Sequence, residues 1–391
     1  MKPIYVGVDN AAESNRQAYI GVDNIARKVS RMYIGDEYGV ARLCYDSTKL
    51  VSTAEGTYTY DFSETLSDIN HRTYTAFADR FILSGGKISS EEYSDQIDII
   101  DNSLTVSSLE LIMDVPKVNH RACVIDGKYL AFIGGTKLND LGNVENHLGL
   151  EIYDKSFTKV LQSTMSYHVS GCTGGSLGKY GVFYGGVKTT SYSDLYDKMI
   201  CIDPDLTMTY HDINSKRTDA GVAYTDDHII FAGGNNDYIN TDPCNYVEAF
   251  DTSLTRSDLS NLSSKCNTIY GATVGEYCLF GSPEIDDVYS EIVDVFDASL
   301  TKRSNLSLHT KKYECAVIGT GDEAIFAGGK IADSNGYLTL YKDVEIFDTS
   351  LTKSTMELQD SHSYKSYCAK LKDKIIIFYE QEKAAEIVKL N

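Results

Sequence analysis

The stretch VEIFDTSLTKS, residues 344–354, recurs along the chain and decides the fold. Each copy is an apolar run that ends in an aspartate and continues into a polar turn. The earlier copies are IDIIDNSLTVS from Ile97, LEIYDKSFTKV from Leu150, MICIDPDLTMT from Met199, VEAFDTSLTRS from Val247 and VDVFDASLTKR from Val293. Their aspartates are spaced by 53, 49, 48, 46 and 51 residues. A fixed period of about 50 residues indicates a repeat architecture, within which every other feature has to be interpreted.

A glycine pair at the end of an apolar run is the second landmark of the repeat. The clear copies are FILSGGK (Phe81–Lys87), AFIGGTK (Ala131–Lys137), VFYGGVK (Val182–Lys188), IIFAGGN (Ile229–Asn235) and AIFAGGK (Ala324–Lys330). Two weaker copies, CLFGSPE from Cys278 and IIIFYEQ from Ile375, bring the number of units to seven. We interpret the run as a strand buried on both faces, and the glycines as a sharp exit where the backbone is crowded or φ is positive.

Each unit is expected to contain four short strands. A strand such as RACVIDGK (Arg121–Lys128) precedes the apolar run and joins it through a hairpin turn. The VEIFD strand and an outer strand such as LTRSDLSNL (Leu254–Leu262) follow the glycine pair. Between these two strands, the Asp and Ser/Thr side chains can hydrogen-bond to the backbone of the turn. Seven units of four antiparallel strands predict an all-β protein, a seven-bladed β-propeller.

On these motifs the chain resembles the kelch-repeat family. The Gly-Gly after strand two, the aromatic-Asp at the end of strand three and the period all match over about residues 57–391. The chain has no tryptophan, however, whereas kelch repeats carry one in the fourth strand. The packing of the outer strands must therefore differ from the family pattern. The resemblance implies a kelch-type propeller and says little about function.

The last unit predicts how the ring closes. From about Tyr364 it supplies three strands, and the sequence then ends. Near the other end, YDFSETLSDI (Tyr60–Ile69) aligns without a gap to FDTSLTRSDL (Phe250–Leu259). We expect a segment within about Gly56–Asn70 to be the outer strand of the last blade, because a closed ring leaves no unpaired edge.

The first 46 residues follow a different period. YVGVDN starts at Tyr5, YIGVDN at Tyr19 and YIGDEYG at Tyr33, which is a strict 14-residue spacing. Each unit is expected to form a short hairpin with a Val-Asp-Asn turn, too small to be stable alone. The repeats resemble those of tail and other virion-associated proteins of phages infecting Gram-positive hosts. We therefore divide the chain into hairpin repeats for attachment or extension, residues 1–46, and the propeller, residues 47–391. A partner virion or a homo-oligomer would assemble through residues 1–46.

Charge and composition exclude several classes of function. The formal net charge is −20, whereas binding to nucleic acid requires a basic face. No run of 18 apolar residues is long enough for a membrane span, so membrane insertion is not expected. The start lacks the apolar segment of a signal peptide, which predicts a protein that is cytoplasmic as synthesised, with virion association as the alternative. The nine cysteines include no CxxC pair, and we interpret them as reduced and buried.

Polar loops rich in tyrosine follow the glycine pairs and are candidates for a binding surface. Such loops offer rigid aromatic faces and adaptable hydrogen bonds, which suit a glycan or a protein ligand. The alternative is that these loops are polar only because they are exposed. The candidate residues are Tyr93, Tyr192, Tyr196, Tyr238, Tyr246 and Tyr337.

Basic residues stand where each innermost strand is expected to begin. They are Arg72, His120, Arg121, His168, Arg217, Lys265, Lys312 and Lys365. Because innermost strands line the channel, these groups could ring its mouth and attract an anionic ligand. The alternative is structural, since kelch repeats often carry an arginine here that hydrogen-bonds to loop carbonyls.

Signatures of catalysis are weak. The eight histidines show no metal-binding spacing, and neither a nucleophile elbow nor a phosphate loop is present. We therefore predict no catalytic residues, no metal and no cofactor. The leading hypothesis is a non-enzymatic binding propeller, associated with a phage or a cell surface, that recognises a glycan or a protein. The alternatives are a carbohydrate-active enzyme of the sugar mutarotase or oxidase kind, and an intracellular kelch interaction scaffold.

Overall fold

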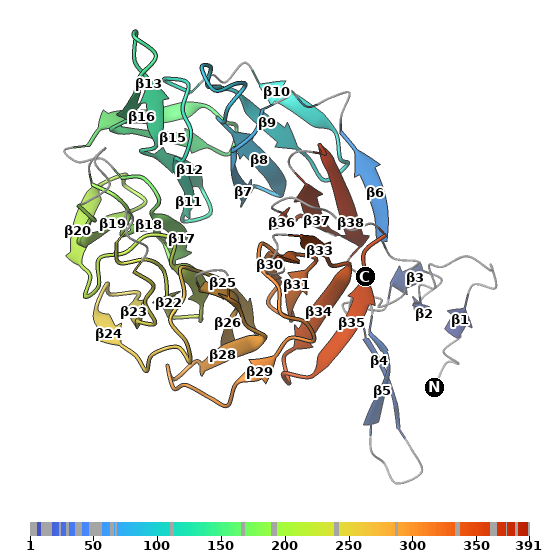
Figure 1. Ribbon diagram of the computed structural model, residues 1–391. Helices are drawn as coiled ribbons and strands as arrows, with labels where there is room; N and C mark the ends of the chain where they lie inside the picture. Colours follow the sequence, from blue (N-terminus) through green and yellow to red (C-terminus); the bar gives the residue numbers. More distant parts are fainter. Residues whose placement is uncertain are drawn as a thin grey trace.

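The computed structural model is an all-β protein whose seven blades stand around a common centre, as predicted (Figure 1). It describes residues 6–8, 18–22, 25–28, 31–35, 41–46, 57–62, 66, 69–109, 113–165, 169–188, 194–237, 242–285, 288–332, 337–359, 366–372, 374–379 and 382–389. The innermost strands of consecutive blades contact one another around the whole ring. This arrangement is a seven-bladed β-propeller.

The blades are numbered in chain order from the innermost strand outward. Blade one is β7 (Thr73–Phe77), β8 (Arg80–Ser84), β9 (Ile97–Ile100) and β10 (Val106–Leu109). Blade two is β11 (Arg121–Ile125), β12 (Tyr129–Ile133), β15 (Gly149–Asp154) and β16 (Lys159–Thr164). Blade three is β17 (Thr173–Leu177), β18 (Tyr180–Tyr184), β19 (Lys198–Ile202) and β20 (Met208–Asp212). Blade four is β21 (Gly221–Tyr224), β22 (His228–Ala232), β23 (Val247–Asp251) and β24 (Arg256–Asp258).

The remaining blades follow the same order. Blade five is β25 (Thr268–Val274), β26 (Tyr277–Ile285), β28 (Ile292–Asp297) and β29 (Leu306–Ser307), with β27 (Val288–Tyr289) paired to β26. Blade six is β30 (Ala316–Gly319), β31 (Glu323–Ala327), β34 (Asp343–Asp348) and β35 (Lys353–Glu357). Blade seven is β36 (Ser366–Lys370), β37 (Lys374–Tyr379), β38 (Ala384–Lys389) and β6 (Thr57–Asp61). Two small hairpins rise between second and third strands, β13 (Thr136–Leu138) with β14 (Val144–Asn146) and β32 (Lys330–Ala332) with β33 (Leu338–Leu340).

Strand β6 closes the ring, which confirms the predicted closure. It pairs antiparallel with β38, so that Asp61 lies opposite Ala384 and Thr57 opposite Val388. The sequence alignment matched Tyr60 and Asp61 to the end of a third strand. In the structure these two residues instead end the outer strand itself, so the closing strand lies just before most of the aligned segment.

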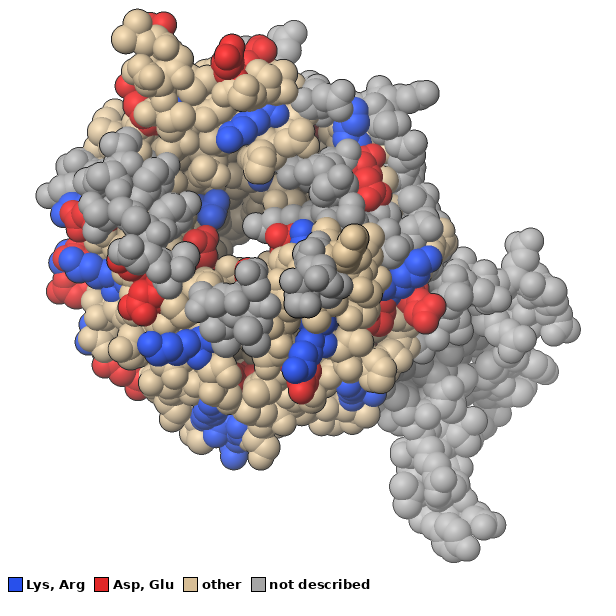
Figure 2. Space-filling model, in the orientation of Figure 1, with Lys and Arg blue, Asp and Glu red and all other residues tan. Residues whose placement is uncertain are grey.

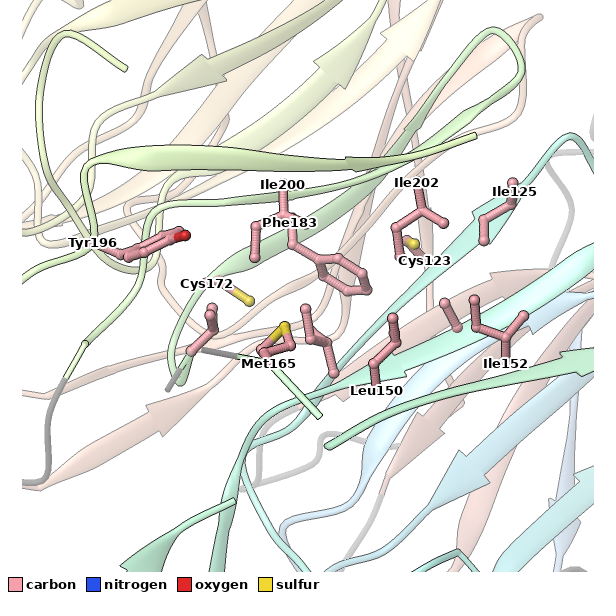
Figure 3. Close-up of a cluster of buried hydrophobic side chains, with 13 residues drawn as sticks. Cys123, Ile125, Leu150, Ile152, Met165, Cys172, Phe183, Tyr196, Ile200 and Ile202 are labelled. Carbon is pink, nitrogen blue, oxygen red and sulfur yellow. The ribbon is translucent and has the colours of Figure 1, made fainter. Parts of the chain in front are cut away.

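The core is divided among the seven gaps between neighbouring blades, each of which holds its own cluster of buried side chains. Between blades two and three, Ile152 and Cys123 meet Phe183 and Ile202 (Figure 3). Successive residues of a strand point to opposite faces, so a second strand contributes to two gaps. In β22, Ile230 packs toward blade five whereas Phe231 packs toward blade three. This placement explains the continuously apolar second strands.

The aspartate turn that ends the third strand of blades one to six stabilises the repeat, as its sequence predicted. In blade four, the Oδ1 atom of Asp251 accepts the backbone N–H groups of Ser253 at 2.9 Å and Thr255 at 2.8 Å. Leu254 between them adopts a φ of +64° and packs against blade three. The same positive φ recurs in the other turns, at Leu104, Phe157, Leu206, Leu300 and Leu351. Each turn therefore also fastens its blade to the preceding one.

The glycine pair permits a close approach between blades. Gly134 has a φ of +63°, and a Cβ atom there would lie 1.9 Å from the carbonyl oxygen of Val169 in the next connection. Gly135 donates its N–H to that same oxygen. A side chain at Gly134 would push this connection away, so the predicted crowding is present.

The N-terminal strands belong to none of the blade sheets. β1 (Val6–Val8), β2 (Ala18–Val22) and β3 (Ile25–Lys28) form one sheet, and β4 (Arg31–Gly35) pairs with β5 (Ala41–Asp46). In the β2–β3 hairpin Val22 lies opposite Ile25, and the aspartate and asparagine of the expected Val-Asp-Asn turn lie outside the described residues. In β1–β2, Gly7 of the first repeat lies opposite Tyr19 of the second.

Candidate functional site

The start of the innermost strands marks one end of the central channel, which we call the channel mouth. The connection that enters each blade and the loop after each glycine pair are joined there by isolated bridges, such as Val118 with Thr136 and Thr218 with Asn235. Both sets of loops therefore lie on one face. Figure 2 shows the ring open at its centre, with basic and acidic side chains near the opening.

A cavity of about 300 Å³ opens at this mouth and is lined by residues of blades two to six. Its polar edge includes Arg121, Asp219 and Thr268, and its apolar wall includes Val222, Ile269 and Tyr270. The volume is at the lower end of the range for ligand pockets, roughly 300–1,000 Å³. Because polar and apolar groups contribute about equally to the lining, the cavity can offer a small ligand both hydrogen bonds and packing.

Glycines in the innermost strands help to shape the cavity. A Cβ atom at Gly174 would lie 2.2 Å from the carbonyl oxygen of Ala122, and one at Gly271 would lie 2.1 Å from that of Val222. The innermost strands of neighbouring blades thus approach backbone to backbone at these points. The lining residues from blade three are the small residues Cys172, Thr173 and Gly174.

Arg121 of blade two reaches toward blade four. Its Nε–H donates to the carbonyl oxygen of Cys172 at 2.8 Å, and its Nη2 atom lies 3.7 Å from Oδ1 of Asp219. The side chains of both residues are about one third exposed, at 34% and 39%. Asp219 has a φ of +54° and donates its N–H to the carbonyl oxygen of Gly171. An oriented and loosely paired acid and base therefore face the cavity.

Three other predicted basic residues lie inside their blades with carboxylate partners. Arg72 contacts Asp98 at 2.6 Å, Arg217 contacts Glu248 at 3.3 Å, and Lys312 contacts Asp343 at 2.9 Å and Glu345 at 3.5 Å. All three basic side chains are at most 2% exposed. The expectation that Arg72 and Arg217 attract an anionic ligand stays a prediction, which replacing both residues with alanine would test. Their burial makes lost stability the first expected effect.

The predicted basic residues do not occupy one equivalent position. Relative to the bridging residue of each connection, Arg217 and Lys312 come before it, whereas Arg72, His120 and Arg121 come after it. In blade two, the counterpart of Arg217 is Lys117, which contacts Glu151 at 2.5 Å and which the sequence analysis missed. The sequence could have identified Lys117, because it stands directly before the bridging residue Val118, just as Arg217 stands directly before the bridging residue Thr218.

The partners of these bases form a row of buried carboxylates that the sequence analysis also missed. They share the second position of the VEIFD-type motif in the third strands, and the counterpart in blade three is Ile200. The row consists of Asp98, Glu151, Glu248, Asp294, Glu345 and Glu386. Most accept a backbone N–H from the connection that enters the blade; Glu248, for example, accepts that of Asn214 at 3.1 Å. The row therefore fastens the mouth loops to the blades.

His120 is fully buried beside the mouth. Its Nε2 lies 2.8 Å from the hydroxyl of Ser84 in the neighbouring blade. Burial lowers the pKa of His120 well below its usual range, and the charges of Lys117 and Arg121 act in the same direction. The imidazole is therefore a neutral packing group in the folded state.

The other predicted residues are distributed as follows. Lys265 is exposed, whereas His168 and Lys365 lie outside the described residues. Of the tyrosines, Tyr93 and Tyr196 are buried, Tyr246 and Tyr337 are exposed, and Tyr192 and Tyr238 lie outside the described residues. The binding role of this whole set stays a prediction.

Within the described residues, no group of His, Cys, Asp and Glu side chains is arranged to hold a metal ion. The eight described cysteine side chains are free thiols, and all but Cys368 are buried. Burial raises the pKa of Cys172, beside the cavity, to about 12, so this thiol is a poor nucleophile at neutral pH. No helix in the described part of the chain has the length and apolar character to cross a membrane.

The ring and its mouth define the protein as a seven-bladed β-propeller. No protein-family model matches the sequence, and no curated protein matches it. Among solved structures, the chain is similar to one titled "Structure of YjhT", with a TM-score of 0.55 and 12% sequence identity. The match covers 75% of this chain and 98% of that one. At this identity the likeness shows the fold alone.

Proposed function

We propose that this protein is a non-enzymatic binding module, a kelch-type propeller that recognises a glycan of a cell surface at its channel mouth. The observation that carries the proposal is the cavity with Arg121 and Asp219 at its edge. The Arg121 side chain is held by a hydrogen bond to the Cys172 carbonyl and the Asp219 backbone by one to Gly171, and both side chains remain partly exposed. Such oriented polar groups beside an apolar wall provide hydrogen bonds and packing for one small unit of a ligand.

The loops on the same face extend this surface. Tyr337, which is 75% exposed, lies in the loop between β32 and β33, and Leu141, which is 85% exposed, lies at the tip of the β13–β14 hairpin. These exposed side chains would offer further contact area to a longer glycan bound on this face. Aromatic side chains add contact area at a small entropic cost, which suits such a rim.

Residues 1–46 would attach the propeller to a larger assembly. Their repeats resemble those of phage virion proteins, and their strands share no sheet with the described blades. The pairing of β1 with β2 joins one repeat to the next, so a further strand could add at the β1 edge. This attachment would make the protein a virion-associated recognition module.

A glycan array probed with the full chain tests the function. We expect binding to a subset of bacterial surface glycans, and loss of that binding in a double variant, Arg121→Ala with Asp219→Ala. The matched control is Lys128→Ala with Asp126→Ala, which removes a charge pair at the β11–β12 turn, on the opposite face. Binding to no glycan, or to a host protein in place of glycans, would contradict the proposal.

A further inference from the structure

The charges at the cavity edge restrict the kind of ligand that can enter. Arg121 and Asp219 are 3.7 Å apart and similarly exposed. An anion placed near Arg121 is attracted by the guanidinium and repelled at nearly the same distance by the carboxylate, so the two Coulomb energies largely cancel. A cation near Asp219 meets the reverse situation. A fully charged ligand therefore gains little net energy and still has to shed its hydration shell.

An uncharged ligand with adjacent donors and acceptors has no such conflict. It can accept a hydrogen bond from the Arg121 guanidinium and donate one to the Asp219 carboxylate, and bonds to ionised groups are the stronger kind. The Arg121 Nη2 atom contacts Asp219 only at the long distance of 3.7 Å, so ligand hydroxyls can insert without breaking a short bond. The net charge of −20 adds a general repulsion of anions.

Apolar residues in the lining of the cavity favour a ligand that also has an apolar face. Val222 and Val317 come from the innermost strands of blades four and six, with Ile269 and Tyr270 of blade five between them. A sugar ring has both features, because its hydroxyl groups project at the edge while its C–H bonds form an apolar face. A cavity of about 300 Å³ has room for one such ring.

From these contacts we infer that the channel-mouth cavity binds a neutral sugar residue, held between Arg121 and Asp219, and rejects acidic sugars. This inference rests on the proposed function and names the class of glycan unit. It differs from the sequence-based expectation of an anionic ligand, because the basic residues expected to attract it, Arg72, Arg217 and Lys312, are paired inside the blades.

Matched sugars test the inference on the full chain. The probes are the methyl glycosides of glucose, galactose and N-acetylglucosamine, compared with the methyl glycosides of glucuronic and galacturonic acid. Binding is measured by saturation-transfer NMR and calorimetry at low and moderate salt. We expect at least one neutral glycoside to bind more tightly than either uronate, with an affinity that changes less than about twofold with salt, since no net charge is neutralised.

Two isosteric variants give the sharper readout. Arg121→Gln and Asp219→Asn should each weaken the neutral probe by about tenfold or more, the loss of one charge-assisted hydrogen bond. Asparagine tolerates the positive φ at position 219, so this variant should fold. Removing the negative charge should also let Asp219→Asn bind a uronate more tightly than the unchanged protein does, in a salt-sensitive way.

The outcomes separate the inference from the proposed function. Tighter binding of a uronate or of free alanine, a zwitterion, than of every neutral glycoside would overturn the inference and leave glycan recognition standing. The same holds if array glycans bind but Arg121→Gln and Asp219→Asn bind them as well as the control variant Lys128→Gln. If no glycan and no glycoside binds, both proposals fall.

Discussion

At the scale of single residues, the buried carboxylates govern how charge is distributed in the blades. Glu248 is 2% exposed and accepts hydrogen bonds from Tyr184, from Arg217 and from the backbone of Asn214. A buried ion pair contributes little net stability against an apolar pair, but removing one partner leaves an uncompensated charge. Blade three, with Ile200 at this position, demonstrates that the fold accepts the apolar solution.

The pair formed by Arg217 and Glu248 provides the first prediction. Glu248→Leu should lower the free energy of unfolding by about 3–5 kcal/mol, because the Arg217 guanidinium stays buried without its carboxylate. Adding Arg217→Met should restore part of that loss, since the stranded charge is gone. Urea unfolding of the single and double variants measures the difference. Additive losses in the double variant would argue against coupling between the two side chains.

At the scale of elements, the sequence predicted the local turn motifs but did not predict which partners the long basic side chains would reach. The glycine pair and the aspartate turn were predicted because their chemistry lies within a few consecutive residues, as with Asp251 and Thr255. The basic residues were misaligned because a long side chain can reach the same kind of carboxylate from different positions. Arg72 follows its bridging residue whereas Arg217 precedes its own, and both reach the third strand.

The aspartate turn provides a prediction at this scale. Asp251→Ala should lower the free energy of unfolding by about 1–2 kcal/mol, the usual cost of losing a side chain that caps orphan N–H groups. It should do so because the backbone N–H groups of Ser253 and Thr255 lose their side-chain acceptor, while the backbone hydrogen bonds of the turn and the packing of Leu254 remain. Ser253→Ala keeps the backbone donor and serves as the matched control, with a change within about 0.5 kcal/mol. Equal urea midpoints for the two variants would contradict the role assigned to Asp251.

At the scale of the whole molecule, the period predicted the ring but not the cavity. Seven landmarks at a fixed spacing were sufficient for the blade count. The cavity is lined by residues of several blades, and at its edge Arg121 extends from blade two to meet Asp219 of blade four. Nothing in a linear pattern links residues of two blades that flank a third, so this juxtaposition required the three-dimensional arrangement.

Closure of the ring by β6 provides the last prediction. Removing residues 1–46 should leave a folded propeller, because β1 to β5 share no sheet with the blades. Removing residues 1–61 also deletes β6 and leaves β38 as a bare edge. The longer truncation should cost at least about 3 kcal/mol, from several strand hydrogen bonds at about 0.5–1.5 kcal/mol each. Its exposed edge should also promote association.

Thermal melting and size-exclusion chromatography of the two truncated proteins compare these effects directly, with the shorter truncation as the control. Closure by β6 would be unimportant to the ring if both proteins melted at the same temperature and eluted as monomers.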